Sequence, residues 1–220
     1  MLNKDQFIIE MTYHSCALEG NSMTFEETTM VYNNQELNLY YNDREFNEIV
    51  NHFDAMELML CYVDQKEVLS NRVIKDMHFE LCKNILHDAG SFKSHDNYIQ
   101  NTNVQTLSPH LVESMMYQWC ENINYRLSIN ESDEMKLREI IEAHVEFEQY
   151  HPFSDGNGRI GRILINYLLL QEDLSPLIIK KQDELKYKQF LHGMSPDAPD
   201  RGTVLNQFLI KVNMDMNNEK

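Results

Sequence analysis

The distribution of proline most restricts the fold of this 220-residue chain. The first of its five prolines is Pro109, and the chain has only seven glycines. Because proline breaks helices and glycine weakens them, the N-terminal half lacks the residues that most readily interrupt helices. Apolar residues also recur at helical spacing along most of the chain. The sequence therefore predicts an all-helical fold.

Local signals indicate where the predicted helices begin and end. Gly20 stands where a left-handed helix end is expected, and Thr24 with Glu27 forms a capping box. Proline at 109 suits a first helical turn, whereas Pro152 ends the helix before it. The expected helices cover about residues 5–20, 24–32, 43–63, 73–86, 109–128, 135–148 and 157–171, with two or three more after residue 176 and a polar tail from residue 213.

Residues 90–106 interrupt the helical pattern. This segment is rich in Asn, Ser and Thr, and short alternating stretches flank residues 101–103. Such a pattern is typical of two short strands joined by a turn. We expect a small β-hairpin or an extended flap here.

The charge of the chain excludes one class of partner. It carries 35 acidic and 19 basic side chains, a formal net charge of −16, whereas nucleic-acid binding needs clustered Lys and Arg. The longest run dominated by apolar residues, 163–170, is far shorter than the roughly 20 residues of a membrane span. The four cysteines form no CxxC pair, and the N-terminus has no signal-peptide pattern, so we expect a cytoplasmic setting and no membrane contact.

Three of the seven glycines, Gly156, Gly158 and Gly161, lie within six residues. Their spacing matches the dinucleotide-binding pattern G-x-G-x-x-G, but that pattern has physical meaning only between a strand and a helix. A predicted helix precedes the glycines here, so we reject a dinucleotide site. What remains is a loop that enters a helix N-terminus, where free backbone N–H groups favour an anion.

The side chains around these glycines favour phosphate chemistry. Arg159 and Arg162 lie three residues apart on one helical turn, and with Asn157 and the backbone amides they describe a polyphosphate cradle. Asp155 would be repelled by phosphate unless a divalent cation such as Mg²⁺ lay between them. His151, mostly neutral near pH 7, can act as a general base toward a hydroxyl. For the glycines alone, a capped helix with surface ion pairs is the simpler interpretation.

Residues 151–162, HPFSDGNGRIGR, resemble the Fic family signature HPFx(D/E)GNGRxxR at every defined position. The resemblance implies an all-helical enzyme that transfers AMP from ATP to a Tyr, Thr or Ser hydroxyl of a target protein and releases pyrophosphate. It implies one site for ATP and Mg²⁺, formed by His151 as the base, Asp155 as the metal ligand, Gly156, Asn157 and Gly158 as the anion hole, and Arg159 and Arg162 for the outer phosphates. Gly161 occupies a free position of the signature within this nucleotide site.

The resemblance also assigns segments outside the signature. Residues 90–106 lie where Fic proteins carry a flap that clamps the target chain by strand pairing. Tyr187 lies where the family often has a tyrosine pair near the adenosine, with Lys186 in place of the first tyrosine. We expect a single domain over 1–220, with a Fic core over about 73–172 and C-terminal helices over 173–220.

A second motif precedes the core. Residues 15–20, SCALEG, resemble the Fic inhibitory helix (S/T)xxxE(G/N), with Ser15, Glu19 and Gly20 at its defined positions. Because Ser15 and Glu19 lie four residues apart, they share one helix face. The resemblance implies that a helix over about 5–20 brings Glu19 to Arg162 and denies that arginine to the γ-phosphate.

Two alternatives to a restrained adenylyltransferase stay open. One is a nucleotide-regulated binding module of the toxin–antitoxin kind. The other is a bifunctional enzyme that also removes AMP from modified proteins. The resemblance is further compatible with a homodimer and with modification of the chain itself.

Overall fold

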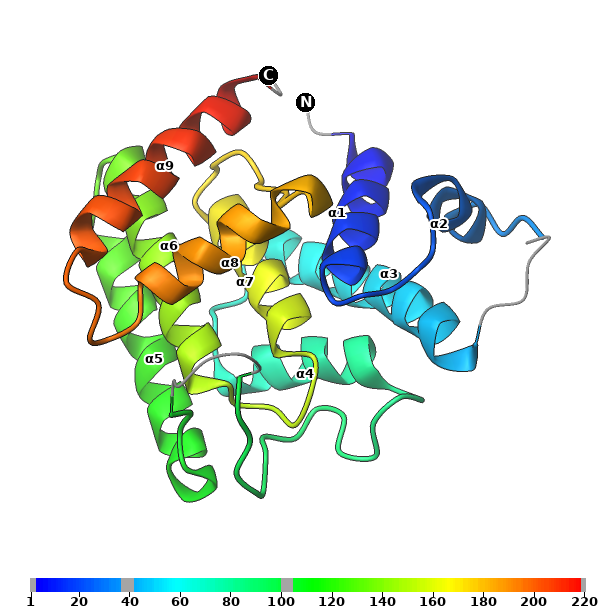
Figure 1. The fold of residues 1–220 in the computed structure, drawn as a ribbon, viewed down its shortest axis with the longest axis horizontal. Helices are drawn as coiled ribbons and strands as arrows, with labels where there is room; N and C mark the ends of the chain where they lie inside the picture. Colours follow the sequence, from blue (N-terminus) through cyan, green and yellow to red (C-terminus); the bar gives the residue numbers. More distant parts are fainter. Residues whose placement is uncertain (1–2, 37–41, 100–104, 219–220) are drawn as a thin grey trace.

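The computed structural model of the protein describes residues 3–36, 42–99 and 105–218, and these residues form helices joined by loops (Figure 1). The elements are α1 (Lys4–Leu18), α2 (Phe25–Tyr32), α3 (Asp43–Asp64), α4 (Asn71–Cys82), α5 (Pro109–Ile129), α6 (Asp133–Tyr150), α7 (Asn157–Gln171), the 3-10 turn η1 (Lys181–Asp183), α8 (Glu184–Gly193) and α9 (Arg201–Asn218). No strand occurs in the described ranges, which confirms the predicted helical class.

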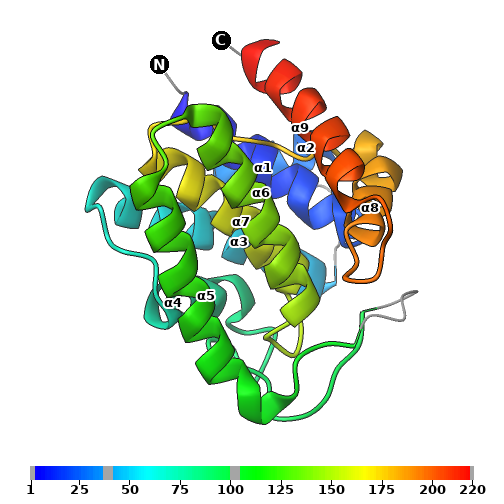
Figure 2. The ribbon, with the colours of Figure 1, turned by 90° about the vertical axis from the view of Figure 1, so that its left-hand side faces the viewer.

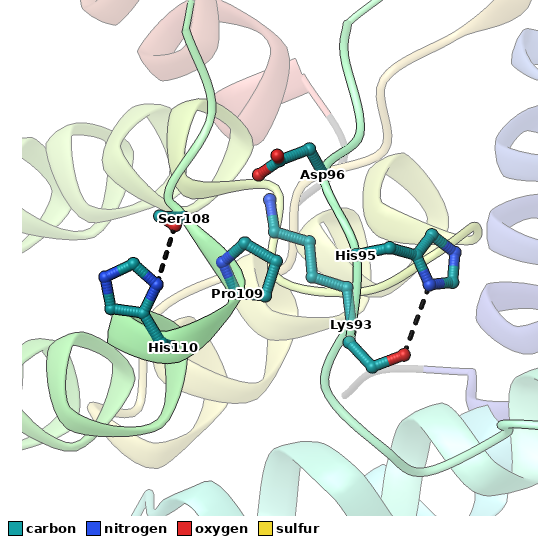
Figure 3. A pocket seen from close by; sticks show the side chains of 7 residues that line it. Lys93, His95, Asp96, Ser108, Pro109 and His110 are labelled. Carbon is teal, nitrogen blue, oxygen red and sulfur yellow. Dashed lines mark hydrogen bonds between the residues drawn. The ribbon is translucent and has the colours of Figure 1, made fainter.

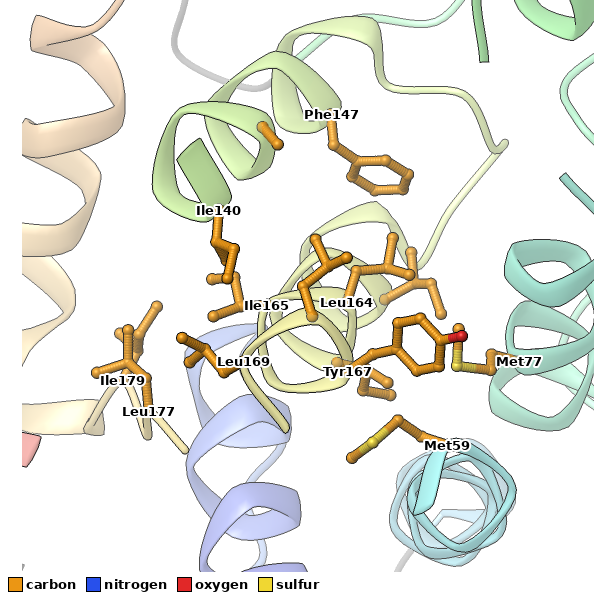
Figure 4. Packing of buried hydrophobic residues seen from close by; sticks show 14 of the residues in the cluster. Met59, Met77, Ile140, Phe147, Leu164, Ile165, Tyr167, Leu169, Leu177 and Ile179 are labelled. Carbon is orange, nitrogen blue, oxygen red and sulfur yellow. The ribbon is translucent and has the colours of Figure 1, made fainter. Parts of the chain in front are cut away.

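Helix α7 lies at the centre of the fold. Twelve of its fifteen residues are buried, and it packs against α1, α3, α4 and α6. Figure 4 shows Met59 of α3 and Met77 of α4 beside one face of α7, with Ile140 and Phe147 of α6 beside another. A helix that is apolar on every face needs such surroundings. The N-terminus of α7 is therefore held by a packed core.

The other helices surround α7 in two groups. Helix α1 packs on α2 and α3, whereas α5 packs on α6. Figure 2 shows α9 alongside α8 at one edge of the molecule. The described residues include no helix long and apolar enough to cross a membrane.

Helix ends that depend on local residues match the predictions. Thr24 and Glu27 form both hydrogen bonds of a capping box at the start of α2. Gly20 has φ +95°, which is the left-handed conformation expected after α1. Helix α7 begins and ends at the predicted residues.

Two predicted helix boundaries are wrong. The helix expected over 73–86 ends at Cys82, because Lys83 turns to an extended conformation and Asn84 has φ +62°. The Asn51 amide of α3 donates to the Lys83 carbonyl at 2.5 Å. A side chain of α3 thus binds the carbonyl that would accept a backbone N–H if α4 continued. The polar tail expected from residue 213 is also wrong as far as residue 218, since α9 continues to Asn218.

The predicted β-hairpin over 90–106 is not seen in the described residues of that segment. Residues 100–104 lie outside the described ranges, and residues 91–99 and 105–108 form no strand. Instead, the Lys93 N–H donates to the Pro152 carbonyl at 2.8 Å, and the Leu107 N–H donates to the Tyr150 carbonyl at 3.2 Å. Lys93 thus bonds to the loop between α6 and α7 and Leu107 to the last residue of α6, while the Thr106 hydroxyl donates to the Asn97 carbonyl at 2.8 Å without strand pairing.

Candidate active site

The loop that joins α6 to α7 carries the predicted site. Its first residue, His151, has φ +48° and ends α6, and the following Pro152 disfavours a further helical turn. Phe153 is fully buried and stacks on His78 of α4, with ring centroids 3.7 Å apart. The Asn157 side chain accepts from the Phe153 N–H and donates to its carbonyl, both at 2.9 Å. The loop is thus fixed by a buried ring and by its own amide.

The imidazole of His151 is suited to accept a proton. Its Nδ1 lies 3.3 Å from the Glu148 carbonyl oxygen. Since a carbonyl only accepts, Nδ1 carries the hydrogen in this contact, and Nε2 presents a lone pair. Burial lowers the pKa of His151, so the ring is neutral near pH 7. His151 therefore has the tautomer and the charge of a general base.

His78 holds the loop from α4. The Gly90 N–H donates to His78 Nδ1 at 3.0 Å, which leaves Nε2 to donate to the Asp155 carbonyl at 3.0 Å. Gly156, at φ +79°, is the N-cap residue of α7 and lies next to the His78 ring. A Cβ on Gly156 would lie 2.9 Å from the Cys82 sulfur and 3.4 Å from His78 Nε2. Close packing against α4 thus requires glycine at position 156.

The other two glycines make room for carboxylates. A Cβ on Gly158 would collide with the Glu19 carboxylate and would lie 3.0 Å from Arg162 Nη1. A Cβ on Gly161 would lie 2.5 Å from Glu148 Oε1 and 3.1 Å from the His144 ring. Gly161 therefore faces α6, whereas Gly158 faces the end of α1.

The two predicted phosphate-binding arginines point to different helices. Arg162 is 3% exposed and donates to the Ser15 hydroxyl and carbonyl at 3.0 Å and to Glu19 Oε1 at 2.7 Å. Arg159 is 2% exposed, and its Nη1 lies 3.5 Å from Glu48 Oε1 of α3. Arg159 Nε and Nη1 have no hydrogen-bond partner among the described residues. A buried guanidinium without full pairing is costly, so Arg159 has donors available for an anion.

Glu19 follows the last residue of α1 and reaches the N-terminus of α7. Burial opposes its ionisation, but the charge and hydrogen bond of Arg162 outweigh this and lower the pKa of Glu19. Its side chain is nevertheless 43% exposed. Ser15, Glu19 and Gly20 thus lie together at the end of α1, with Ser15 and Glu19 both on Arg162.

Asp155 lies at the outer side of the same loop, with its side chain 44% exposed. Its Oδ1 accepts from the Gly156 N–H, and its Oδ2 pairs with Arg44 Nη2 of α3, both at 2.7 Å. Burial opposes ionisation, but Arg159, the Gly156 N–H and Arg44 together lower the pKa of Asp155. The carboxylate is therefore ionised near neutral pH.

Asp155 fits a metal that arrives with a ligand. The described residues contain no group of three or more His, Cys, Asp or Glu side chains that could hold a metal ion by themselves. Mg²⁺, however, is usually bound by one or two carboxylates together with substrate phosphates and waters. A single ionised, half-exposed carboxylate beside a helix N-terminus suits that arrangement.

Tyr187 of α8 is buried, and its hydroxyl lies 2.8 Å from His144 Nε2. Burial lowers the pKa of His144 to about 3, and burial raises the pKa of the neighbouring Glu148 to about 7. Tyr187 thus belongs to a buried polar cluster on the α6 side of α7. Neither His144 nor Glu148 is among the site residues predicted from the sequence.

An open pocket of about 600 Å³ lies between the segment after Gly90 and the start of α5. It is lined by Lys93, Ser94, His95, Asp96, Ser108, Pro109 and His110 (Figure 3). The Lys93 ammonium is buried and donates to Asn97 Oδ1 at 2.6 Å and to the Thr106 hydroxyl at 3.2 Å. Burial lowers the pKa of Lys93 to about 8. Lys93 thereby joins both arms of this segment next to the loop of His151.

Sequence comparison links this site to a known family. Residues 68–169 match the Fic/DOC family. Protein adenylyltransferase Fic of Drosophila willistoni is 29% identical over 194 residues, which cover 86% of this chain and 37% of the relative. Protein adenylyltransferase fic-1 of Caenorhabditis briggsae is 24% identical over 183 residues, which cover 82% of this chain and 35% of the relative. This chain thus spans little more than a third of the curated relatives that it matches.

Structural comparison gives the same result for the fold. A Fic domain containing signaling protein from Bacteroides thetaiotaomicron superimposes with a TM-score of 0.83 at 21% identity, covering 97% of this chain and 85% of the other. Fic-1 from C. elegans superimposes with a TM-score of 0.79 at 20% identity, covering 96% of this chain and 62% of the other. The comparisons therefore support the Fic family for this chain, and its fold is that of solved Fic proteins.

Proposed function

We propose that the chain is a protein adenylyltransferase, which transfers AMP from ATP to a Tyr, Thr or Ser hydroxyl of a target protein or of itself. One observation carries this proposal. A neutral His151 with Nε2 available stands at the start of a loop that leads to Asp155 and to the N-terminus of α7, whose first two turns carry two buried arginines. The curated names of relatives that match over 82–86% of the chain support it.

The transfer step follows from the positions of these groups. The target hydroxyl oxygen attacks the α-phosphorus of ATP, and His151 Nε2 takes the hydroxyl proton. The bond from the α-phosphorus to the bridging oxygen then breaks, and pyrophosphate leaves with the electron pair. A positioned base of this kind contributes about 10²- to 10⁴-fold to a rate. The backbone amides of residues 156–158 and the guanidinium groups of Arg159 and Arg162 stabilise the charge on the phosphates.

Asp155 would hold the Mg²⁺ that accompanies ATP. The ion would neutralise charge on the leaving pyrophosphate. The contribution of this chain is to keep Asp155 ionised, through the Gly156 N–H and the charge of Arg159. Its Oδ1 is fixed by the Gly156 amide, which orients the carboxylate outward.

Glu19 is proposed as an inhibitory residue. Its carboxylate pairs with Arg162 and fills the space beside Gly158, so a phosphate at Arg162 would compete with it for the same donors. The segment over 90–106 is proposed as the flap that contacts the target, because its Lys93 N–H and its Asn97 amide donate to carbonyls of the loop of His151. The cytoplasmic setting, the homodimer and the division of a single domain into segments 5–20, 73–172 and 173–220 stay predictions.

Intact-mass spectrometry tests the proposed reaction. Glu19→Gly protein is incubated with a mixture of ATP, UTP, CTP and GTP, with and without candidate target proteins. We expect the modified protein to gain the mass of one AMP, and we expect Glu19→Gly/His151→Ala to gain nothing. A gain of one phosphate would replace nucleotide transfer with phosphate transfer. Tight ATP binding by calorimetry without any mass gain would favour the nucleotide-regulated binding module.

A further inference from the structure

The N-terminal helices supply an opposite charge to every charged side chain of residues 155–162. Glu19 after α1 lies 2.7 Å from Arg162, and Glu48 of α3 lies 3.5 Å from Arg159. Arg44 of α3 lies 2.7 Å from Asp155. In the first two contacts, a carboxylate pairs with an arginine that would otherwise be open to a phosphate. The third contact is of the opposite kind, because it brings a cation to the carboxylate.

Arg44 is fixed between two carboxylates. Its Nε pairs with Glu48 Oε1 at 3.2 Å, four residues along the same helix, while its Nη2 reaches Asp155 Oδ2. The Asn42 side chain caps the first turn of α3 and so holds the start of the helix that carries Arg44. The Gly156 N–H occupies the other oxygen, Oδ1. Both oxygens of Asp155 therefore have partners.

We propose that Arg44 is a second inhibitory residue, whose guanidinium occupies the Asp155 oxygen that the Mg²⁺ of a nucleotide would need. A ligand oxygen must approach Mg²⁺ to about 2.0–2.1 Å, and a guanidinium bonded to the same oxygen would repel the ion. The N-terminal helices thereby restrain the site at two points, one that competes with phosphate and one that competes with the cation. This inference rests on the proposed function, because it takes Asp155 as the metal ligand.

The exposure of the pair sets the size of the effect. The side chains of Arg44 and Asp155 are 58% and 44% exposed. Ion pairs this open to water are weak, so Arg44 is expected to reduce the metal affinity only about two- to fivefold. Glu19 and Arg44 also act on different ligands, so the Arg44 contact should appear in cation binding and not in metal-free nucleotide binding.

The experiment measures cation binding directly. Mn²⁺, used in place of Mg²⁺, is titrated by water-proton relaxation into the full chain saturated with α,β-methylene ATP, whose carbon bridge blocks AMP transfer. Arg44→Gln is compared with Arg72→Gln, since Arg72 is 56% exposed and also pairs with two carboxylates, Glu67 and Asp76. We expect Arg44→Gln to raise the Mn²⁺ affinity two- to fivefold, and Arg72→Gln to leave it unchanged. In EDTA, Arg44→Gln should not strengthen binding of the nucleotide.

Three results would overturn the inference. The first is an unchanged Mn²⁺ affinity in Arg44→Gln, and the second is an equal rise in Arg72→Gln, which would indicate a general effect of charge. The third is stronger metal-free nucleotide binding in Arg44→Gln, which would mean that Arg44 blocks the nucleotide itself. Asp155→Asn separates the two levels of the proposal. If it leaves Mn²⁺ binding intact, the metal role of Asp155 fails together with the inference. If it abolishes Mn²⁺ binding while Arg44→Gln has no effect, only the role of Arg44 fails.

Discussion

Replacing Glu19 by glycine removes the contact that joins the end of α1 to Arg162. The variant loses a charge-assisted hydrogen bond of 2.7 Å and frees the space beside Gly158. Ser15 still accepts from Arg162 Nε and Nη2, so the arginine stays in place with one donor released. Glu19 is the C-cap residue of α1, with φ −93°, a conformation that glycine can also adopt.

The size of the effect follows from the exposure of the contact. A hydrogen bond to a charged group contributes roughly 1.5–3 kcal/mol, and the 43% exposure of the Glu19 side chain reduces this to about 1–2 kcal/mol. If the Arg162 donor binds phosphate with the same free energy in the variant, AMP transfer at subsaturating ATP should rise about 5- to 30-fold. The same loss should lower the Tm by about 2–8 °C.

The assay is incorporation of α-labelled ATP into protein over time, at ATP concentrations below saturation. Glu19→Gln keeps the shape of the side chain but not its charge, so it should give a smaller increase than Glu19→Gly. Glu10→Gln is the matched control, because Glu10 lies on α1 and its carboxylate accepts from Gln6 rather than from Arg162. Equal rates for Glu19→Gly and the unchanged protein, with His151→Ala still abolishing incorporation, would refute the inhibitory role of Glu19.

Phe153→Ala should lower the free energy of unfolding by about 3–5 kcal/mol in urea titrations, and Phe153→Leu by less, because the ring is fully buried. Gly158→Ala should destabilise the otherwise unchanged protein more than the Glu19→Gly variant, since the added Cβ collides with the Glu19 carboxylate. A double-mutant cycle of thermal unfolding measures the difference between the two effects. Burial lowers the pKa of His52 to about 3, whereas the unfolded chain takes up that proton below about pH 6.5. Because only the unfolded chain binds this proton, His52 leaves the free energy of unfolding unchanged above pH 6.5 and lowers it as the pH falls, by up to about 2 kcal/mol at pH 5. His52→Asn should remove this decrease in the free energy of unfolding.

The parts of the fold that were predictable from sequence depend on neighbouring residues. The capping box of Thr24 and Glu27 and the left-handed Gly20 use residues within four positions of each helix end. Helix α7 could be delimited because a helix N-terminus follows directly from Gly156 and because its apolar residues are continuous. The residues of 151–162 lie in one loop and one helix, so their proximity needed no long-range information.

The features that sequence reasoning missed depend on distant partners. Helix α4 ends where Asn51 of α3 binds the Lys83 carbonyl, and the sequence around Lys83 does not predict that contact. Lys93 and Asn97 bond to carbonyls of the α6–α7 loop, and the described residues of 90–106 form no strand despite their alternating pattern. Arg44 looks like half of an ordinary i,i+4 pair with Glu48, and its contact with Asp155 spans 111 positions. His78 gave no signal beyond a place on the buried face of its helix.

The packing of α1 limits how the contact with Arg162 can be broken. Five of its apolar side chains, Phe7, Ile8, Met11, Cys16 and Leu18, lie in the core. Burying each is worth about 1.5–3 kcal/mol, so detaching the helix would cost about as much as the 5–15 kcal/mol that holds a typical domain folded. Glu19, in contrast, lies beyond the helix and is half-exposed. A regulator that relieves the restraint therefore has to displace one side chain at the end of α1, and capturing the whole helix would unfold the protein.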